Sequence, residues 1–346
     1  MALSFIDSCR VTKVRKEHDS IVFEGALHPE ICVGSLPFGG HILAVVISAV
    51  QETIKDTPLP DVIHLAAYFL KAGEVGPCEV RVRYIRHGKT FNNLEVQLIQ
   101  KGATRLTAQF IVGILIEPQL DPISAPPLTL TPASPLYRRT PVGLHPSQAE
   151  AIQLPKFLRF RGGLRCAVDK LYDERNRQKA GGANDSSDIN KNGVLEYGAL
   201  LELTHPEDEV TAVTMPIFAD MFRSTPVLLT AAEGRTSITE GAGFNWFPTM
   251  VLSIEFKHRL PRGPSVARNR VAIYSESRFL TAGRHEVMIE VWTTPPGVLG
   301  DARPPLESDW REKMVCLAVS TQMALTMSGL ENTKRGNRSS QSTSKL

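Results

Sequence analysis

The 346-residue chain is poor in the features that mark secreted, membrane-spanning or nucleic-acid-binding proteins. Its five cysteines are scattered, odd in number and never spaced as CxxC, which predicts free thiols in a reducing compartment rather than a disulfide framework or a zinc site. The longest mostly apolar run has about fourteen residues, fewer than the roughly 20 that a membrane-spanning helix needs. The first residues lack the order of a secretory signal. A net charge of +3 is too small to indicate a nucleic-acid or membrane-surface partner.

Several catalytic and ligand-binding motifs are also missing. The sequence contains no Gly-x-Ser-x-Gly elbow, no P-loop and no dinucleotide fingerprint, which argues against a serine hydrolase of the α/β type and against nucleotide-dependent enzymes. Residues 188–193 imitate the start of a calcium loop, but Ala199 stands where that loop needs a bidentate Glu. We therefore predict no metal site and no bound cofactor. A basic cluster interleaved with Phe157 and Phe160 is too small for a nucleic-acid site and is interpreted as a solvated face: Lys156, Arg159, Arg161 and Arg165.

The most informative stretch that is present is residues 37–50, where a Gly-Gly turn leads directly into an almost entirely apolar segment. This segment predicts a helix over residues 40–54. A helix that is apolar on every side must be buried on every side. Because several strand-like runs follow, the pattern favours an α+β hotdog fold, in which a curved antiparallel sheet wraps one central helix. The N-terminus of such a helix offers unpaired N–H groups to a carbonyl oxygen.

The order of the predicted elements repeats once along the chain. In the first half, the helix lies between a strand at 21–27 and four strands at 61–71, 78–87, 90–100 and 104–116. In the second half, a strand at 196–203 and a helix at 213–223 precede strands at 249–259, 269–278, 285–293 and 313–327. This order predicts a double hotdog, with an N-terminal domain (1–116), a linker rich in proline (117–156), a C-terminal domain (157–330) and a disordered tail (331–346).

Four spaced blocks of the first half resemble the TesB-like (type-II) acyl-CoA thioesterases: Pro37-Phe38-Gly39-Gly40, residues 68–73, residues 85–91 and residues 100–102. The resemblance is looser over residues 195–328. It implies two hotdog domains and hydrolysis of an acyl-CoA to a free acid and coenzyme A, with the coenzyme present only as part of the substrate. It also implies a catalytic Asp, a Ser or Thr, and a Gln, all from the second half.

Carried over by spacing, only the Gln finds a matching residue, Gln322. The Asp position falls on Val251, and the Ser/Thr position falls near Arg278, next to Ser277. We therefore predict Gln322 and Ser277 as catalytic residues, and Val251 and Arg278 as part of the substrate site. Valine cannot deprotonate water, so three explanations are open: the register is off by one or two residues, the catalytic group has moved, or the fold does something other than hydrolysis.

His64 is the candidate for a moved catalytic base, because the same spacing in the first half places it at the position symmetric to Val251. A partly buried structural histidine is the alternative. Gly39 and Gly40 permit close backbone approach, and the N–H groups of Gly40 and His41 are expected to face a bound carbonyl.

The chain ends in Ser344-Lys345-Leu346, which at a C-terminus is an address read by the peroxisomal import receptor. The sequence thus favours a peroxisomal enzyme that hydrolyses hydrophobic acyl-CoA thioesters, with a homo-oligomer as an option. Two alternatives stay open because of Val251. One is a non-hydrolytic hotdog protein, either an acyl-thioester binder or a dehydratase, cyclase or acyl-transfer enzyme of biosynthesis. The other is an inactive subunit that pairs with an active partner.

Overall fold

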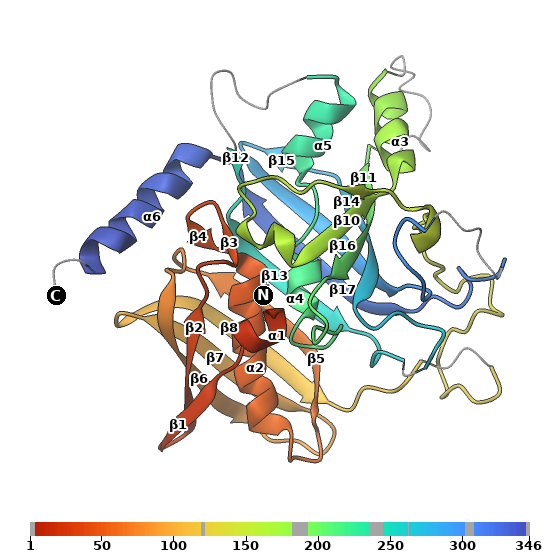
Figure 1. Cartoon of the computed structure of the whole chain (residues 1–346). Helices are drawn as coiled ribbons and strands as arrows, with labels where there is room; N and C mark the ends of the chain where they lie inside the picture. The colour runs from red at the N-terminus through yellow and green to blue at the C-terminus, as the bar shows by residue number, and fades with distance from the viewer. Residues whose placement is uncertain are drawn as a thin grey trace.

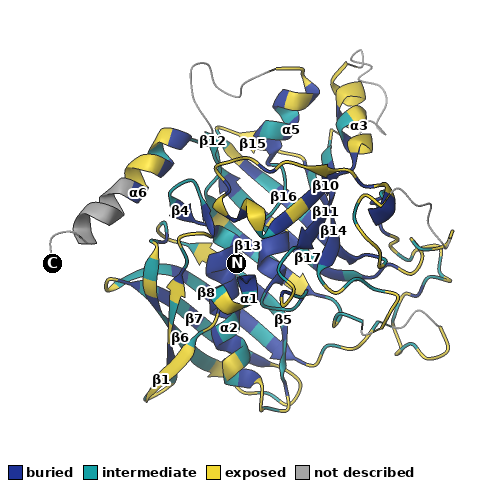
Figure 2. Ribbon diagram, in the orientation of Figure 1, coloured by how far each residue is buried: buried dark blue, intermediate teal, exposed yellow. Residues whose placement is uncertain are grey.

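The computed structural model describes residues 4–118, 122–181, 193–235, 245–261, 263–301 and 308–343. Its main feature is one antiparallel sheet of 14 strands in the order β1-β2-β6-β7-β8-β5-β13-β17-β16-β14-β11-β10-β9, with β15 paired to β16 alone (Figure 1). Each half contributes one curved part of this sheet. Buried residues, most of them apolar, gather along the strands of both parts (Figure 2).

The two halves have the same strand order, which confirms the predicted double hotdog. The elements of the first half are β2(Ser20–Leu27), α2(Gly39–Ile54), β5(Asp61–Phe69), β6(Gly76–Arg86), β7(Asn92–Gln100) and β8(Ala103–Gly113). Those of the second are β11(Leu195–Leu203), α4(Met215–Ala219), α5(Thr225–Ala232), β13(Thr249–Phe256), β14(Arg270–Ser277), β16(Arg284–Thr293) and β17(Cys316–Leu325). The order β2-β6-β7-β8-β5 thus mirrors β11-β14-β16-β17-β13.

The halves join edge to edge through β5 and β13, which pair antiparallel from Val251 opposite Tyr68 to Glu255 opposite His64. This pairing satisfies the backbone groups of two strands that would otherwise be open sheet edges. A bidentate ion pair between Arg259 and Asp61 lies beside the same seam, at 2.6 Å for its shortest contact. The relative position of the two halves is therefore fixed by backbone hydrogen bonds.

Helix α2 is the predicted central helix and is buried without interruption from Gly40 to Ile47. The second half differs from the prediction, because its helix is split into α4 and α5. Helix α4 ends at Ala219, and Pro226 stands in the first turn of α5, where its missing N–H costs little and favours a new helix start. Asp220 follows directly on α4 as its C-cap.

Shorter elements complete the chain: α1(Phe5–Ser8), β1(Thr12–Glu17), β3(Cys32–Val33), β4(Leu36–Pro37), 3-10 turns at Pro146–Gln148 and Arg159–Gly162, β9(Ala151–Ile152), β10(Leu164–Val168), α3(Lys170–Gly181), β12(Asn245–Trp246), β15(Leu280–Thr281) and β18(Met327–Ser328). Strand β9, from the predicted linker, pairs with β10. None of the helices in the described ranges is long and apolar enough to cross a membrane.

The tail predicted to be disordered instead forms helix α6(Gly329–Thr343). Its anchor is Asn332, whose amide nitrogen donates to the Val33 carbonyl (3.0 Å) and whose amide oxygen accepts from the Ser35 N–H (2.9 Å). The Arg335 guanidinium lies over the Trp246 ring, 5.4 Å from its centroid. These contacts with distant segments stabilise a helix whose polar sequence would not form one alone. Ser344-Lys345-Leu346 and most of the calcium-loop-like segment lie outside the described residues.

Candidate active site

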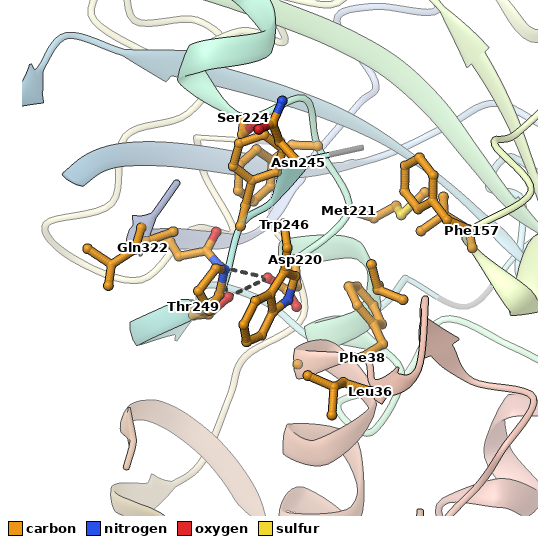
Figure 3. Close-up of a pocket in the computed structure, with 18 of the residues that line it drawn as sticks. Leu36, Phe38, Phe157, Asp220, Met221, Ser224, Asn245, Trp246, Thr249 and Gln322 are labelled. Atoms are coloured by element: carbon orange, nitrogen blue, oxygen red, sulfur yellow. Dashed lines mark hydrogen bonds between the residues drawn. The ribbon is translucent and has the colours of Figure 1, made fainter. Parts of the chain in front are cut away.

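A cavity of about 790 Å³ lies where the two halves meet. Most of its walls are apolar and come from widely separated segments: Leu36, Phe38, Ile42, Phe69, Leu154, Phe157, Met221, Phe222, Trp246 and Phe247. The end of the predicted linker contributes to one wall, since the Gly34 N–H donates to the Phe157 carbonyl (2.7 Å). The polar lining is small and includes Asp220, Thr249 and Gln322, drawn together in Figure 3. An apolar cavity with a few convergent polar groups is the usual form of a small-molecule site.

Asp220, Thr249 and Gln322 form a closed hydrogen-bonded cluster (Figure 3). The Gln322 Nε2 group donates one hydrogen to Asp220 Oδ1 (2.7 Å) and the other to Thr249 Oγ1. The Thr249 hydroxyl donates to the same Asp220 oxygen (3.3 Å). The backbone N–H of Gly40, in the first turn of α2, donates to Asp220 Oδ2 (2.8 Å). Four donated hydrogens are thereby arranged so that Asp220 accepts three of them and Thr249 one.

The environment of Asp220 sets its acidity. Enclosure by protein raises the pKa of this carboxyl from its ordinary value of 3.8 to about 7, although the hydrogen bonds from Gln322, Gly40 and Thr249 act in the opposite direction. The positive end of the α2 dipole also favours the ionised form. A carboxyl with a pKa of about 7 can accept a proton at neutral pH and release it again, as a general base requires.

Local structure explains why Thr249 faces this cluster and Val251 does not. Gln322 stands opposite Leu252, so these two side chains share the inner face of the sheet. A bulge between Thr249 and Val251 inserts one extra residue into β13, so side chains on its two sides no longer alternate regularly between the two faces of the sheet. Thr249 therefore stands opposite Ala324 on the Gln322 face, whereas Val251 stands opposite Met323 on the other face.

The expectation that no Asp lies beside Gln322 is corrected. Asp220 stands next to Gln322, where the resemblance places an Asp, and Thr249 supplies the hydroxyl expected from Ser277. Counting residues along β13 from Phe256 cannot find Asp220, because Asp220 lies at the end of α4 and not in β13. The sequence did contain a signal, an acidic residue within the otherwise apolar segment 215–222. Gln322 is the one predicted catalytic residue that the structure places in the cluster.

The other predicted catalytic and binding side chains lie outside the cavity lining. His64 Nε2 is hydrogen-bonded to Ser253 Oγ (2.9 Å) at the β5–β13 seam, as in the structural alternative. Ser277 is buried in β14 opposite Leu195. The exposed Arg278 side chain is paired with Glu276. None of these three contacts a residue of the Asp220 cluster in the part of the chain that the structure describes.

The N–H groups of Gly40 and His41, expected to face a bound carbonyl, are both occupied within the protein. Gly39 lines the cavity, but the Gly40 N–H is already bonded to Asp220, and the His41 N–H is bonded to the Phe38 carbonyl (3.1 Å). The His41 ring is buried, near Cys9 Sγ and the His28 N–H, and burial lowers its pKa to about 3. This leaves the N–H of Gly39, the first residue of α2, as the first-turn donor without a recorded acceptor among the described residues.

The two glycines differ in what a side chain would meet. A Cβ at Gly40 would lie 2.6 Å from the Pro216 carbonyl oxygen and 3.0 Å from Ile217 Cα, both backbone atoms of α4, whereas a Cβ at Gly39 would lie 2.7 Å from Asp220 Oδ2. We expect Gly40→Ala to destabilise the protein by about 2 kcal/mol or more, because two packed helices must separate. Gly39→Ala should lower kcat by about a hundredfold with little loss of stability, because only the carboxylate is displaced. Urea denaturation and turnover of both variants check this, and equal stability losses would contradict it.

The raised pKa of Asp220 also predicts a pH-dependent stability. The folded protein holds the proton up to a pH of about 7, whereas the unfolded chain loses it above the ordinary value of 3.8, so Asp220 costs stability as the pH rises between these values. Relative to the wild type, Asp220→Asn should become more stable by up to about 3 kcal/mol between about pH 5 and about pH 8. Urea denaturation of both proteins at the two pH values measures the difference. A difference that does not change with pH would show that Asp220 ionises normally.

Metal-ligating side chains do not gather in the described ranges, where no group of three or more His, Cys, Asp and Glu residues could hold an ion. The Asp220 cluster itself contains one carboxylate, one hydroxyl and one amide, all of them mutually hydrogen-bonded.

Comparisons with known proteins agree with this architecture. Residues 27–113 match the family model of the acyl-CoA thioesterase N-terminal domain. No match was found among curated proteins. The fold is similar to that of a hotdog protein of unknown function from Alicyclobacillus acidocaldarius, with 14% identity, 94% of this chain and 98% of the other covered, and a TM-score of 0.62.

Two further structures of similar coverage carry thioesterase names. One is titled as a candidate thioesterase II from Thermobifida fusca, with 15% identity, 94% and 98% coverage, and a TM-score of 0.62. The other is the acyl-CoA thioesterase II TesB2 of Mycobacterium marinum, with 12% identity, 94% and 98% coverage, and a TM-score of 0.57. At these identities the likeness concerns the fold. The predicted TesB-like resemblance is confirmed to this extent: residues 27–113 match the acyl-CoA thioesterase N-terminal domain, and the whole chain has the same double hotdog fold as the TesB-like structures.

Proposed function

We propose that the protein hydrolyses acyl-CoA thioesters that carry a hydrophobic acyl chain. The observation that supports this most strongly is the Asp220–Thr249–Gln322 cluster, set in the wall of a large apolar cavity. The thioester carbonyl would lie beside the cluster, and the acyl chain would fill the apolar part. The match of residues 27–113 to a thioesterase domain agrees with this assignment.

The chemistry follows from the hydrogen-bond pattern. Ionised Asp220 takes a proton from a water molecule, whose oxygen attacks the carbonyl carbon of the thioester. Gln322 Oε1 is buried and has no partner among the described residues, so it can accept the second hydrogen of that water and orient it. The N–H of Gly39 at the start of α2 can stabilise the charge that develops on the carbonyl oxygen. The tetrahedral intermediate then expels the coenzyme A sulfur, which receives the proton from Asp220.

The non-hydrolytic alternative and the inactive-subunit alternative lose their basis. Both were favoured by the apparent replacement of the catalytic Asp with Val251. Asp220 supplies a carboxylate within hydrogen-bond distance of Gln322, so the residues that the TesB-like resemblance requires are all present. A general base and a water-orienting amide are needed for hydrolysis, whereas simple binding of a thioester needs neither.

The test is release of free thiol from a panel of acyl-CoAs of increasing chain length, followed with a thiol-reactive dye. Hydrolysis should increase with chain length until the cavity is filled, because each buried methylene adds about 0.8 kcal/mol of binding. Binding of acyl-CoA without thiol release at any length would refute hydrolysis and restore the binder alternative.

The phosphates of coenzyme A need a cationic surface, and we assign Arg335 of α6 to it, together with Lys71, which also lines the cavity. We expect Arg335→Ala to raise KM for acyl-CoA about tenfold and to leave kcat within about twofold, because a hydrogen bond to a charged group is worth roughly 1.5–3 kcal/mol and this one is exposed. The matched control is Lys334→Ala, whose ammonium is paired with Glu331 (3.1 Å). Equal KM values for the two variants would remove Arg335 from the site.

We also propose import into the peroxisome through Ser344, Lys345 and Leu346, on the sequence alone. The test compares a fluorescent protein carrying residues 329–346 at its C-terminus with the same fusion lacking the tripeptide. Punctate fluorescence is expected only for the complete tail, and diffuse fluorescence of both would refute the proposal. The predicted homo-oligomer stays a prediction that the molar mass in solution can test.

A further inference from the structure

Two polar side chains in the cavity wall have no use in the proposed mechanism. His285 is 2% exposed and Ser224 is 6% exposed, and both line the cavity. The hydroxyl of Ser224 has no hydrogen-bond partner within the described residues. The two ring nitrogens of His285 also lack a side-chain partner there, and the protein group that favours a proton on the ring is the backbone of Gly283. At least one ring nitrogen is therefore open to a ligand. Burying such a group unsatisfied costs about 1–3 kcal/mol, so each of them requires an explanation.

The structure brings these two residues together from different elements. Ser224 immediately precedes α5, and His285 is the second residue of β16. The residues that follow them are joined, since Thr225 Oγ1 donates to the Glu286 carbonyl (3.2 Å). The start of α5 thus lies directly against the start of β16, and both polar groups enter the same part of the cavity wall.

This polar pair is close to the Asp220 cluster. On β16, His285 stands opposite Ala324 and Val287 stands opposite Gln322. His285 therefore lies two residues, about 7 Å along the strand, from the residue that faces Gln322. Ser224 lies four residues after Asp220, and Figure 3 shows it further along the cavity wall than the cluster of Asp220. A ligand whose carbonyl lies at the Asp220 cluster can therefore also reach His285 and Ser224.

The chemistry of the pair restricts what it can bind. Burial lowers the pKa of His285, so the ring is neutral and offers one donor and one acceptor. Its edge-to-face contact with Phe247 (5.8 Å between centroids, 84°) holds the ring in place. A hydroxyl can also donate and accept. Two neutral groups of this kind suit an uncharged oxygen. The neighbouring cation, Arg223, is already paired with Asp173 (3.0 Å), so a carboxylate or phosphate bound here would have to compete for it.

We propose that the cavity selects acyl thioesters whose chain carries a hydroxyl or keto oxygen a few carbon atoms from the thioester, bound by His285 and Ser224. The inference rests on the proposed function for the position of the thioester. An unsubstituted chain leaves both polar groups unpaired in an apolar environment, and a substituted chain satisfies them. A site built to bind a hydroxyl rejects the analogue that lacks it more strongly than an apolar pocket rejects an extra methylene.

The experiment compares octanoyl-CoA with β-hydroxyoctanoyl-CoA, β-oxooctanoyl-CoA and δ-hydroxyoctanoyl-CoA. We expect kcat/KM of the wild type to favour at least one substituted chain by about tenfold or more. His285→Phe and Ser224→Ala should each bring that ratio close to one. Ser224 makes no side-chain cap to α5, so its replacement removes no helix-capping bond. The matched control is Ser275→Ala, whose buried hydroxyl also lacks a partner among the described residues but does not line the cavity, and it should keep the wild-type ratio.

A binding measurement separates this inference from the proposed hydrolysis. Trp246 lines the cavity, so its fluorescence should report binding of octanoate and of the hydroxyoctanoates whether or not thioesters are cleaved. Tighter binding of a hydroxy acid, lost in His285→Phe, would support the polar subsite even if no thiol is released. The inference is overturned if the unsubstituted ligand is preferred in both assays, or if His285→Phe and Ser224→Ala keep the wild-type preference. In that case the two groups are satisfied by water alone.

Discussion

Asp220→Asn should lower kcat by about a thousandfold while KM changes little. A positioned general base contributes roughly 10²–10⁴-fold, and Asp220 is the carboxylate that accepts hydrogen bonds from Gln322, Thr249 and Gly40 at the cavity wall. The asparagine has nearly the same shape but cannot take a proton from water. Thiol release from a saturating acyl-CoA measures the effect. The control is Asp61→Asn. Asp61 is the first residue of β5 and does not line the cavity.

The same residue determines the expected pH dependence. Because the pKa of Asp220 is about 7, kcat of the wild type should rise about tenfold per pH unit below that value and level off above it. A variant that retains wild-type turnover, or a rate that is independent of pH between about 5 and about 8, would show that Asp220 is not the base and that another group activates the water.

Gln322→Ala is expected to lower kcat by about a hundredfold, as much as Gly39→Ala and less than Asp220→Asn. The amide of Gln322 links Asp220 and Thr249 through both hydrogens of Nε2, and its oxygen is the buried acceptor that we assign to the attacking water. Removing it leaves the base in place but leaves the water unoriented, so the loss should be smaller than for Asp220→Asn.

The comparison for this variant is Gln109→Ala, an exposed glutamine on the last strand of the N-terminal half. Single-turnover kinetics should show the loss in the chemical step and not in product release. A KM effect alone would instead assign Gln322 to substrate binding. Rescue by Gln322→Glu is not expected, because a second carboxylate beside Asp220 would favour the protonated form of one of them.

The N-terminal half could be predicted almost completely. Its helix is apolar on every side and begins after a Gly-Gly turn, and its strands are separated by clear turn residues. The predicted helix 40–54 and the strands at 61–71 and 78–87 differ from the observed elements by two residues or fewer at each end. The tail is the counterexample, because the contacts of Asn332 with Val33 and Ser35 connect residues almost 300 positions apart.

The sequence by itself determined the duplicated order of elements, the buried central helix and the presence of Gln322, since these depend on local pattern and on a resemblance that local blocks carry. Only the tertiary structure decided which residues meet Gln322. Asp220 lies 102 positions before it, directly after the short helix α4, and Thr249 lies 73 positions before it, turned inward by a bulge. Neither the end of α4 nor a one-residue bulge can be read from spacing along the chain, because both depend on how strands and helices pack in three dimensions.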